Sequence, residues 1–293
     1  MLKFLKNWTL PLAMFAGAIG YFLLANVTIL EPAKPFVNWL IAVLTPFLIF
    51  AQLLLTFCKI EPKELLPKAW HVWLLSIQAV SSGIIALLLI FCPMEEAYRD
   101  IFEGAMVCLI CPTATAAAVI TGKLGGSAST LTTYTLLSNV LAAIAVPLVF
   151  PLVEPHADIT FVVAFLKILS KVFPLLLAPF FIALLFRYYI PSVHRLLSKY
   201  HGVAFYLWAV ALTIVTGQTV RSLVTAAADV SIEIMIALAG LATCCLQFYF
   251  GKRIGSAYHD RISAGQALGQ KNTVLAIWMA VTYLNPLSSV GPG

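Results

Sequence analysis

Long apolar runs alternate with short polar stretches along the chain, and each run is long enough to cross a bilayer as a helix. The pattern predicts nine membrane-crossing helices, at about Trp8–Leu30, Phe36–Phe57, Trp70–Phe91, Ile101–Lys123, Ala128–Val153, Lys171–Ile190, Val203–Val220, Ile232–Phe250 and Ile262–Leu284. Before the sixth run, Ala157–Ser170 is largely apolar and carries Lys167, four residues before Lys171 on one helical face. This spacing predicts an interfacial lead-in, with both lysines as headgroup anchors.

The composition indicates the broad class of protein. Of the 293 residues, 61% are hydrophobic and 10% are charged, and the mean hydropathy is +0.98. Soluble proteins contain about 45–50% apolar and 25% charged residues. We therefore expect an all-α polytopic membrane protein that is surrounded by the lipid bilayer.

The sequence carries no signature of a metal site, a cofactor site or an enzyme. The six cysteines lie in or beside apolar runs without metal-ligand spacing, so we expect them to act as small apolar side chains. The five histidines fall near predicted helix ends, and no paired acid or nucleophile accompanies them. We expect no metal, no cofactor and no catalytic centre.

The formal net charge of +6 comes from basic residues spread among the loops, which is a topology signal and not the mark of a nucleic-acid-binding protein. Of the 18 basic residues, Lys271 lies within a predicted span and 17 lie in the loops or near the ends of spans. If the amino terminus is cytoplasmic, 12 of these 17 lie inside and five lie outside, namely Lys34, Arg99, Lys167, Lys171 and Arg221. This excess predicts a cytoplasmic amino terminus. We expect the protein to lie in the cell (inner) membrane. The basic start, Met1–Lys6, precedes an apolar run too long for a signal peptide, so we expect a retained first helix.

The ninth run departs from the apolar pattern at Lys271. This lysine lies about 15 Å along a helix from Arg261, close to the middle of a bilayer, where an ionisable group costs roughly 2.5 to 3.5 kcal/mol. Its stem is too short to bring the ammonium to the headgroups from that depth. We therefore expect Lys271 to face a cavity or a partner. The residues beside it favour an unwound stretch of backbone, and they are Gly269, Gln270, Asn272 and Thr273.

The fourth run contains a second interruption, at Pro112–Val119. Proline removes a backbone donor there, and the small residues that follow let another backbone approach closely. A proline kink alone would explain one such break. The fourth and ninth runs are, however, each fourth in a series of five, and the second series is inverted because five is odd. Paired discontinuous helices at corresponding positions indicate a transporter binding site.

Three of these motifs, taken in order, resemble the bile acid:sodium symporter family, including its broader bacterial branch. Cys111-Pro112 followed by small residues resembles that family's fourth-helix crossover. Gly125-Gly126, with the later spacing of Pro147 and Pro151, resembles the turn into its fifth helix. Gly269–Ala276 resembles its ninth-helix signature of a glycine, two residues, an asparagine, a small residue and, further on, leucine-alanine.

The resemblance implies a fold of two inverted five-helix repeats, residues 1–156 and 157–293. Helices 1, 2, 6 and 7 would form a panel domain, and helices 3, 4, 5, 8, 9 and 10 a core domain in which the discontinuous helices 4 and 9 cross. No apolar run follows Pro286–Gly293, which resembles the lead-in to the family's tenth helix. We therefore expect the final, tenth helix to be absent from this chain.

Most of the family's sodium ligands are replaced in this sequence. The positions that resemble its helix 4 serine-asparagine pair hold Ala117 and Ala118. Its helix 9 glutamate position holds Ala267, and the following glutamine position holds Lys271. Alanine supplies no side-chain oxygen and lysine would repel a sodium ion, so we expect no pair of sodium sites of the family type.

The candidate substrate and ion site comprises the polar residues at and around the two breaks, namely Gln78, Thr113, Thr115, Thr135, Gln270, Lys271, Asn272 and Thr273. We expect Asn272 mainly to orient the backbone, and Lys271 to replace the bound cation as a proton-coupling group or as the counter-charge of an anion. The predicted function is sodium-independent secondary transport of an organic anion, either bile acid-like or a small carboxylate, with protons as the candidate coupling ion. The alternative is a membrane receptor or scaffold that retains the fold without transport.

Overall fold

The computed structural model describes residues 8–59, 61–155, 158–200, 203–226 and 229–293. Within these ranges the regular elements are helices, and seven of them are long and apolar enough to cross a membrane. They are α2 (Thr9–Asn26), α3 (Lys34–Lys59) with the 3-10 helix η1 (Thr28–Ala33) before it, α4 (Ala69–Phe91), α7 (Ala128–Val153), α8 (Phe161–Tyr189), α10 (Val203–Thr225) and α11 (Val230–Ala257). The prediction of an all-helical chain is confirmed for the described residues, and the seven long apolar helices are compatible with a polytopic membrane protein. The basic start Met1–Lys6 and the repeat boundary at residues 156 and 157 lie outside the described residues.

The predicted interruptions of the fourth and ninth runs are also confirmed. The fourth run divides into α5 (Glu96–Ile110) and α6 (Ala117–Lys123), and the ninth into α12 (Arg261–Gly269) and α13 (Thr273–Tyr283). Pro112 explains the first break because it forces the preceding Cys111 into extended backbone, with ψ at 139°. Both breaks are shorter than predicted, since residues 117–119 are helical and Thr273 already belongs to α13. The side chain of Asn272 accepts a hydrogen bond from the Leu275 N–H, which starts the new helix at once.

The predicted interfacial lead-in before the sixth run is wrong for the described residues. Residues 161–189 form one continuous helix, α8, that includes both Lys167 and Lys171; Ala157 lies outside the described residues. The whole of α8 is long and apolar enough to cross a membrane, so the two lysines do not mark a separate element before it. The helix α11 likewise continues past the predicted end at Phe250, as far as Ala257. A short helix that was not predicted, α9 (Pro191–Lys199), follows α8 and starts on a proline, which is a favourable first helical residue.

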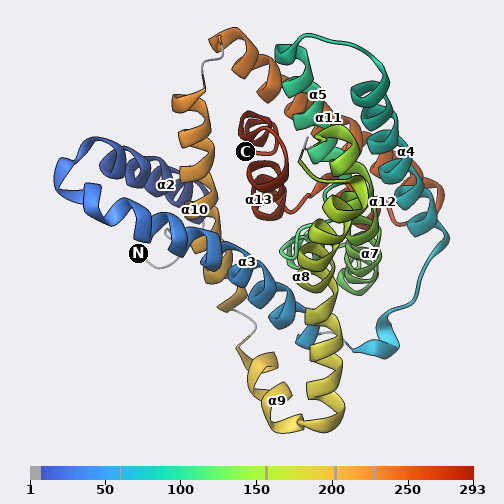
Figure 1. The fold of residues 1–293 in the computed structure, drawn as a ribbon. Helices are drawn as coiled ribbons and strands as arrows, with labels where there is room; N and C mark the ends of the chain where they lie inside the picture. The colour runs from blue at the N-terminus through green and yellow to red at the C-terminus, as the bar shows by residue number, and fades with distance from the viewer. Residues whose placement is uncertain (1–7, 60, 156–157, 201–202, 227–228) are drawn as a thin grey trace.

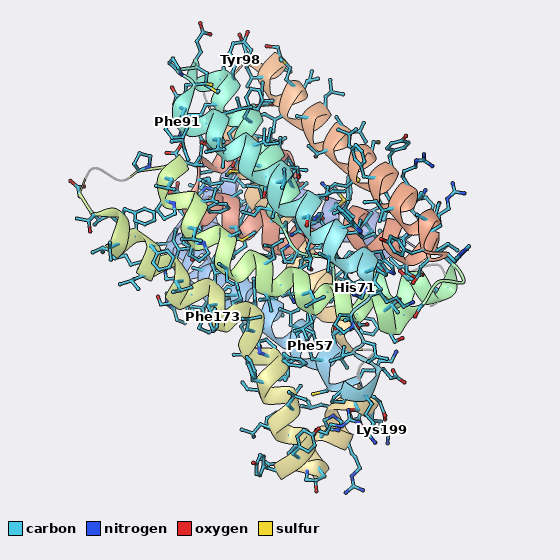
Figure 2. The ribbon with its side chains drawn as sticks, turned by 90° about the vertical axis from the view of Figure 1, so that its right-hand side faces the viewer. Phe57, His71, Phe91, Tyr98, Phe173 and Lys199 are labelled. Atoms are coloured by element: carbon cyan, nitrogen blue, oxygen red, sulfur yellow. The ribbon has the colours of Figure 1, made fainter. Side chains whose placement is uncertain are left out.

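The long helices form two groups that are joined by α8, which packs along both α3 and α7 (Figure 1). In one group α10 packs along α2 and α3, and α3 also packs against α8. In the other, α4, α7 and α11 pack around the two divided runs, α5–α6 and α12–α13, and α12 lies along α11. The buried core includes nearly all of α13, from Val274 to Ala280. Figure 2 places Phe91 and Tyr98 at one end of the molecule and Lys199 at the opposite end, and α4 runs from Phe91 to His71, part of the way between them.

The segment after α13 packs back into this core. It forms the 3-10 helix η3 (Pro286–Val290), whose Leu287, Ser288 and Ser289 are buried against α5, α10, α11 and α13. The backbone of Gly291 lies against Gly104 of α5 and Gly240 of α11, and a side chain on Gly240 would collide with the Gly291 carbonyl. The segment predicted to be a lead-in to a tenth helix is therefore a packed element in this structure. The remaining short element is the 3-10 helix η2 (Pro62–Glu64), between α3 and α4.

Candidate functional site

The two helix breaks lie against each other and share backbone hydrogen bonds. The Ala114 N–H donates to the Gln270 carbonyl at 2.9 Å, and the Asn272 N–H donates to the Pro112 carbonyl at 2.9 Å. Together these bonds form an isolated antiparallel bridge that pairs Thr113 with Lys271. Unwound backbone inside a membrane needs internal partners, and each break supplies them to the other.

The carboxyl end of α5 is held by side chains from other helices. A helix leaves its last four carbonyl groups without donors from its own backbone. In α5 the last two of these groups, on Ile110 and Cys111, accept hydrogen bonds from the Gln78 amide of α4 at 2.9 and 3.3 Å. The side-chain oxygen of Gln78 accepts a hydrogen bond from the Tyr134 hydroxyl at 3.2 Å. Because Gln78 is 1% exposed, its amide is a buried cap on the end of α5.

Lys271 caps the same helix end with a positive charge. Its ammonium donates to the Leu109 carbonyl at 3.3 Å, and the amide of Gln247 from α11 donates to the Cys108 carbonyl at 3.3 Å. The carboxyl end of a helix carries partial negative charge, so an ammonium there is favourably placed. Lys271 is half-buried and makes no ion pair with any carboxylate among the residues that the structure describes. The ammonium is therefore balanced by helix-end carbonyls and not by an acidic side chain.

The end of α12 is held in a similar way from the fourth run. The Thr113 hydroxyl donates to the Ala267 carbonyl at 2.6 Å, and the Thr113 N–H donates to the Ser138 hydroxyl of α7 at 3.2 Å. Thr113 and Ser138 are both fully buried. Each broken helix therefore supplies a residue, Thr113 or Lys271, that caps the other one.

The structure brings four of the predicted site residues into this hydrogen-bond network, namely Gln78, Thr113, Lys271 and Asn272. Gln270 takes part through its backbone carbonyl only. Thr135 is buried beside the network, where its hydroxyl donates to the Leu131 carbonyl of its own helix. Thr115 and Thr273 are half-buried at the starts of α6 and α13, and their side chains make no hydrogen bond within the described part of the chain.

Sequence reasoning missed three members of the site, namely Tyr134, Ser138 and Gln247. It also missed Asn139, which is fully buried next to Ser138 and whose side-chain amide has no hydrogen-bond partner among the described residues. The available signal was a row of polar residues at helical spacing inside the apolar run of α7, where the polar positions recur every three or four residues.

Two alanines at positions that the resemblance would assign to sodium ligands pack in an apolar cluster. Ala117 and Ala267 are fully buried in one hydrophobic cluster with Trp70, Leu131 and Tyr134. Within the described residues, no group of three or more histidine, cysteine, aspartate or glutamate side chains is placed to hold a metal ion. Among the polar groups of the site, the amides, hydroxyls and backbone groups have no preference for either sign of charge, whereas the ammonium of Lys271 favours an anion.

Comparisons with known proteins leave the family open. No protein-family model matches the chain, and a search of the curated proteins found no match. What the site can do is therefore inferred from its geometry.

Proposed function

We propose that the protein is a secondary active transporter of an organic anion and that the paired helix breaks form its binding site. The proposal is carried by the backbone hydrogen bonds between residues 112–114 and 270–272, which put a lysine where two discontinuous helices meet. Discontinuous helices form the substrate and ion sites of many secondary transporters. An ammonium at this place favours an anion as the substrate. The resemblance in sequence suggests either a bile acid-like anion or a small carboxylate.

We further propose the inverted-repeat fold of the bile acid:sodium symporter family, with repeats at 1–156 and 157–293. Three observations support it. Three long helices precede each divided run in its proposed repeat, namely α2, α3 and α4 in the first and α8, α10 and α11 in the second. The helix α10 packs along α2 and α3, and α3 packs along α8, as in a panel, while α8 also joins this group to α7. The helices α4, α7 and α11 pack around the two divided runs, as the core would. Transport then follows from movement of one group past the other, which exposes the breaks alternately to the two sides.

In this proposal Lys271 replaces the bound sodium ion of the family. A sodium ion would be held by oxygen atoms, but the residues at the expected ligand positions are Ala117 and Ala267, which pack in an apolar cluster. The ammonium instead donates to the Leu109 carbonyl and so supplies a fixed positive charge to the end of α5. Transport is therefore expected to need no sodium, with protons as the coupling ion.

The decisive experiment measures uptake of labelled anions into proteoliposomes, across a sodium gradient and separately across a pH gradient. The anions are a bile acid, a 2-keto acid and a small carboxylate. The test variant is Lys271→Gln, because glutamine keeps an N–H donor for the Leu109 carbonyl while it removes the charge. The matched control is Lys123→Gln, which removes an exposed lysine at the end of α6.

The wild type is expected to take up at least one anion without sodium. Lys271→Gln is expected to abolish that uptake or to make it independent of pH, whereas Lys123→Gln leaves it unchanged. Strict dependence of the wild type on sodium, or an unchanged rate in a folded Lys271→Gln protein, would contradict the proposal.

A receptor or scaffold that does not transport is the second candidate. It is favoured by the hydrogen bond between Lys271 and Leu109 and by the packed alanines, because a site closed on itself has no need of a ligand to complete it. Under this reading no anion is taken up under either gradient. The same uptake measurement therefore separates the two functions.

A further inference from the structure

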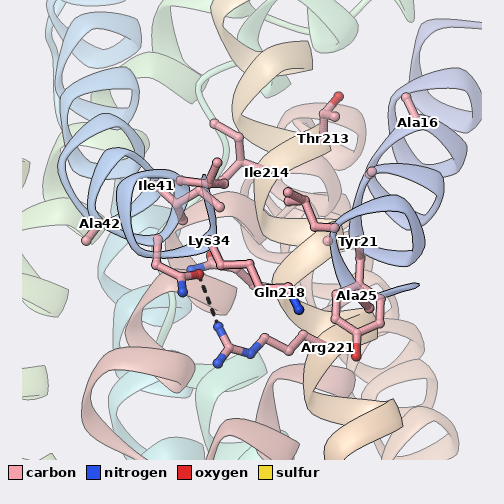
Figure 3. A pocket seen from close by; sticks show the side chains of 16 residues that line it. Ala16, Tyr21, Ala25, Lys34, Ile41, Ala42, Thr213, Ile214, Gln218 and Arg221 are labelled. Carbon is pink, nitrogen blue, oxygen red and sulfur yellow. Dashed lines mark hydrogen bonds between the residues drawn. The ribbon is translucent and has the colours of Figure 1, made fainter. Parts of the chain in front are cut away.

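A second site lies away from the helix breaks, among α2, α3 and α10. These helices line an open cavity of about 620 Å³, a size typical of small-ligand sites (Figure 3). Its apolar walls are made by small and aliphatic residues, among them Ala16, Ala25, Val37, Ile41 and Ile214. The breaks contribute no residue to the lining of this cavity, so a ligand here would not compete with the proposed substrate.

The shape of the cavity follows from glycines on two helices. Gly17 of α2 and Gly217 of α10 bring these helices into backbone contact, and a Cβ atom on Gly17 would collide with the Thr213 carbonyl. One turn further along α2, Gly20 lines the cavity and has open space beside it, with nothing within 4 Å of a Cβ atom placed there. Only Ala13 and Gly17 of α2 are buried, so this helix leaves the cavity accessible from its surroundings.

Basic and amide side chains gather at one end of the cavity. Figure 3 shows Lys34, Gln218 and Arg221 at this end, where the Arg221 guanidinium donates to the Asn38 side-chain oxygen at 3.3 Å. Lys34 also pairs with Glu31 at 3.4 Å, on the exposed surface. Two cations and one carboxylate leave an excess of positive charge at this end. An anionic group would therefore be bound there more strongly than a neutral one.

One further observation narrows the chemistry of the ligand. The side-chain oxygen of Gln218 is buried and has no hydrogen-bond partner among the described residues. A buried acceptor without a donor costs roughly 1–3 kcal/mol, so a ligand that donates a hydrogen bond there gains affinity. The ligand should accordingly combine an anionic group, a hydroxyl donor and an apolar chain.

We propose that this cavity binds an anionic phospholipid with a hydroxylated headgroup, of the phosphatidylglycerol type. Its phosphate lies between Lys34 and Arg221, and a headgroup hydroxyl donates to Gln218. An acyl chain runs along the apolar wall past Gly20. A membrane lipid fits better than a soluble anion because α2 and α3 expose large apolar side chains that indicate lipid contact, such as Phe15 and Trp39.

The test measures lipid retention by native mass spectrometry of the full chain in detergent, after incubation with phosphatidylglycerol or with phosphatidylcholine. The charge variant is Lys34→Gln/Arg221→Gln. Its matched control is Lys63→Gln/Lys123→Gln, which also removes two exposed basic residues, one in η2 and one at the end of α6. A second variant, Gly20→Leu, fills the apolar wall, and its control is Gly83→Leu, since Gly83 of α4 also has open space beside it.

The wild type should retain phosphatidylglycerol in preference to phosphatidylcholine. The charge variant should reduce this retention about tenfold or more, since each basic residue contributes to the attraction of an anionic headgroup. Gly20→Leu should also reduce it, and both controls should leave it unchanged. Equal retention of the two lipids, or equal retention of phosphatidylglycerol by the wild type and the charge variant, would overturn the proposal. The proposal would also be overturned if glycerol phosphate raised the thermal stability of the protein as much as phosphatidylglycerol does, because glycerol phosphate has no acyl chain.

Discussion

Removal of the Gln78 side-chain amide tests how far the end of α5 depends on side chains for its hydrogen bonds. Gln78→Met keeps the length and approximate volume of the side chain while it removes every polar atom. The Ile110 and Cys111 carbonyls then lose the amide that donates to them, and the Tyr134 hydroxyl loses its acceptor. Gln78 is 1% exposed, so water is not at hand to take its place.

The size of the effect can be worked out from these contacts. A buried polar group left without a partner costs about 1–3 kcal/mol. Two carbonyls and one hydroxyl are affected, but one of the carbonyl contacts is long, at 3.3 Å, and contributions within one network are not additive. We therefore expect Gln78→Met to lower the free energy of unfolding by roughly 2 to 4 kcal/mol.

Gln52 of α3 provides a matched control. It is also a buried glutamine in an apolar helix, 3% exposed, but its amide nitrogen has no hydrogen-bond partner in the described part of the chain. Gln52→Met should therefore leave the stability unchanged or raise it, because it removes a polar group that was buried at a cost. Unfolding of both variants in mixed micelles, followed by circular dichroism, gives the two free energies. If Gln78→Met proved as stable as the wild type, or as Gln52→Met, the capping role of Gln78 would be refuted.

Two further predictions concern packing and topology. Gly17→Ala should destabilise the protein by roughly 1–3 kcal/mol, because the new Cβ atom would collide with the Thr213 backbone. Gly20→Ala should be neutral or slightly stabilising, because there is open space beside Gly20. Similar thermal unfolding of the two variants would contradict the close contact of α2 and α10. In a background without the native cysteines, a cysteine at Ser198 should be labelled only from the cytoplasm and one at Ala97 only from outside, as the charge distribution predicts. Labelling of Ser198 from outside in intact cells would reverse the assignment.

The spans and the two breaks were predictable because their causes are local. A run of about 20 apolar residues marks a membrane crossing wherever it occurs, and Pro112 interrupts a helix whatever lies around it. The full length of α8 was not predictable in the same way, since hydropathy reports the surroundings of a helix and not where its backbone hydrogen bonds end. The packed turn η3 depends on contacts with four other helices, which no local pattern encodes.

Within the candidate site, Lys271 and Thr113 could be found from the sequence because each stands at a break in an apolar run. Their partners could not be found in this way. Lys271 donates to the carbonyl of Leu109, and Ser138 accepts from the backbone of Thr113, and both pairings arise only when helices distant in the sequence are packed together. The same holds for the cavity among α2, α3 and α10, whose existence depends on how three helices diverge from one contact at Gly17.

The position of Lys271 between two helix ends has a consequence for how an anion would bind. The ammonium faces the negative end of α5 through the Leu109 carbonyl, and it stands two residues before the positive, amino-terminal end of α13. The first of these ends favours the ammonium, while the second disfavours it and favours an anion. An ammonium donates up to three hydrogen bonds, and within the described residues one is made, to Leu109. An anion that accepts the remaining donors would satisfy the ammonium and the start of α13 together, and it would do so without releasing the cap on α5.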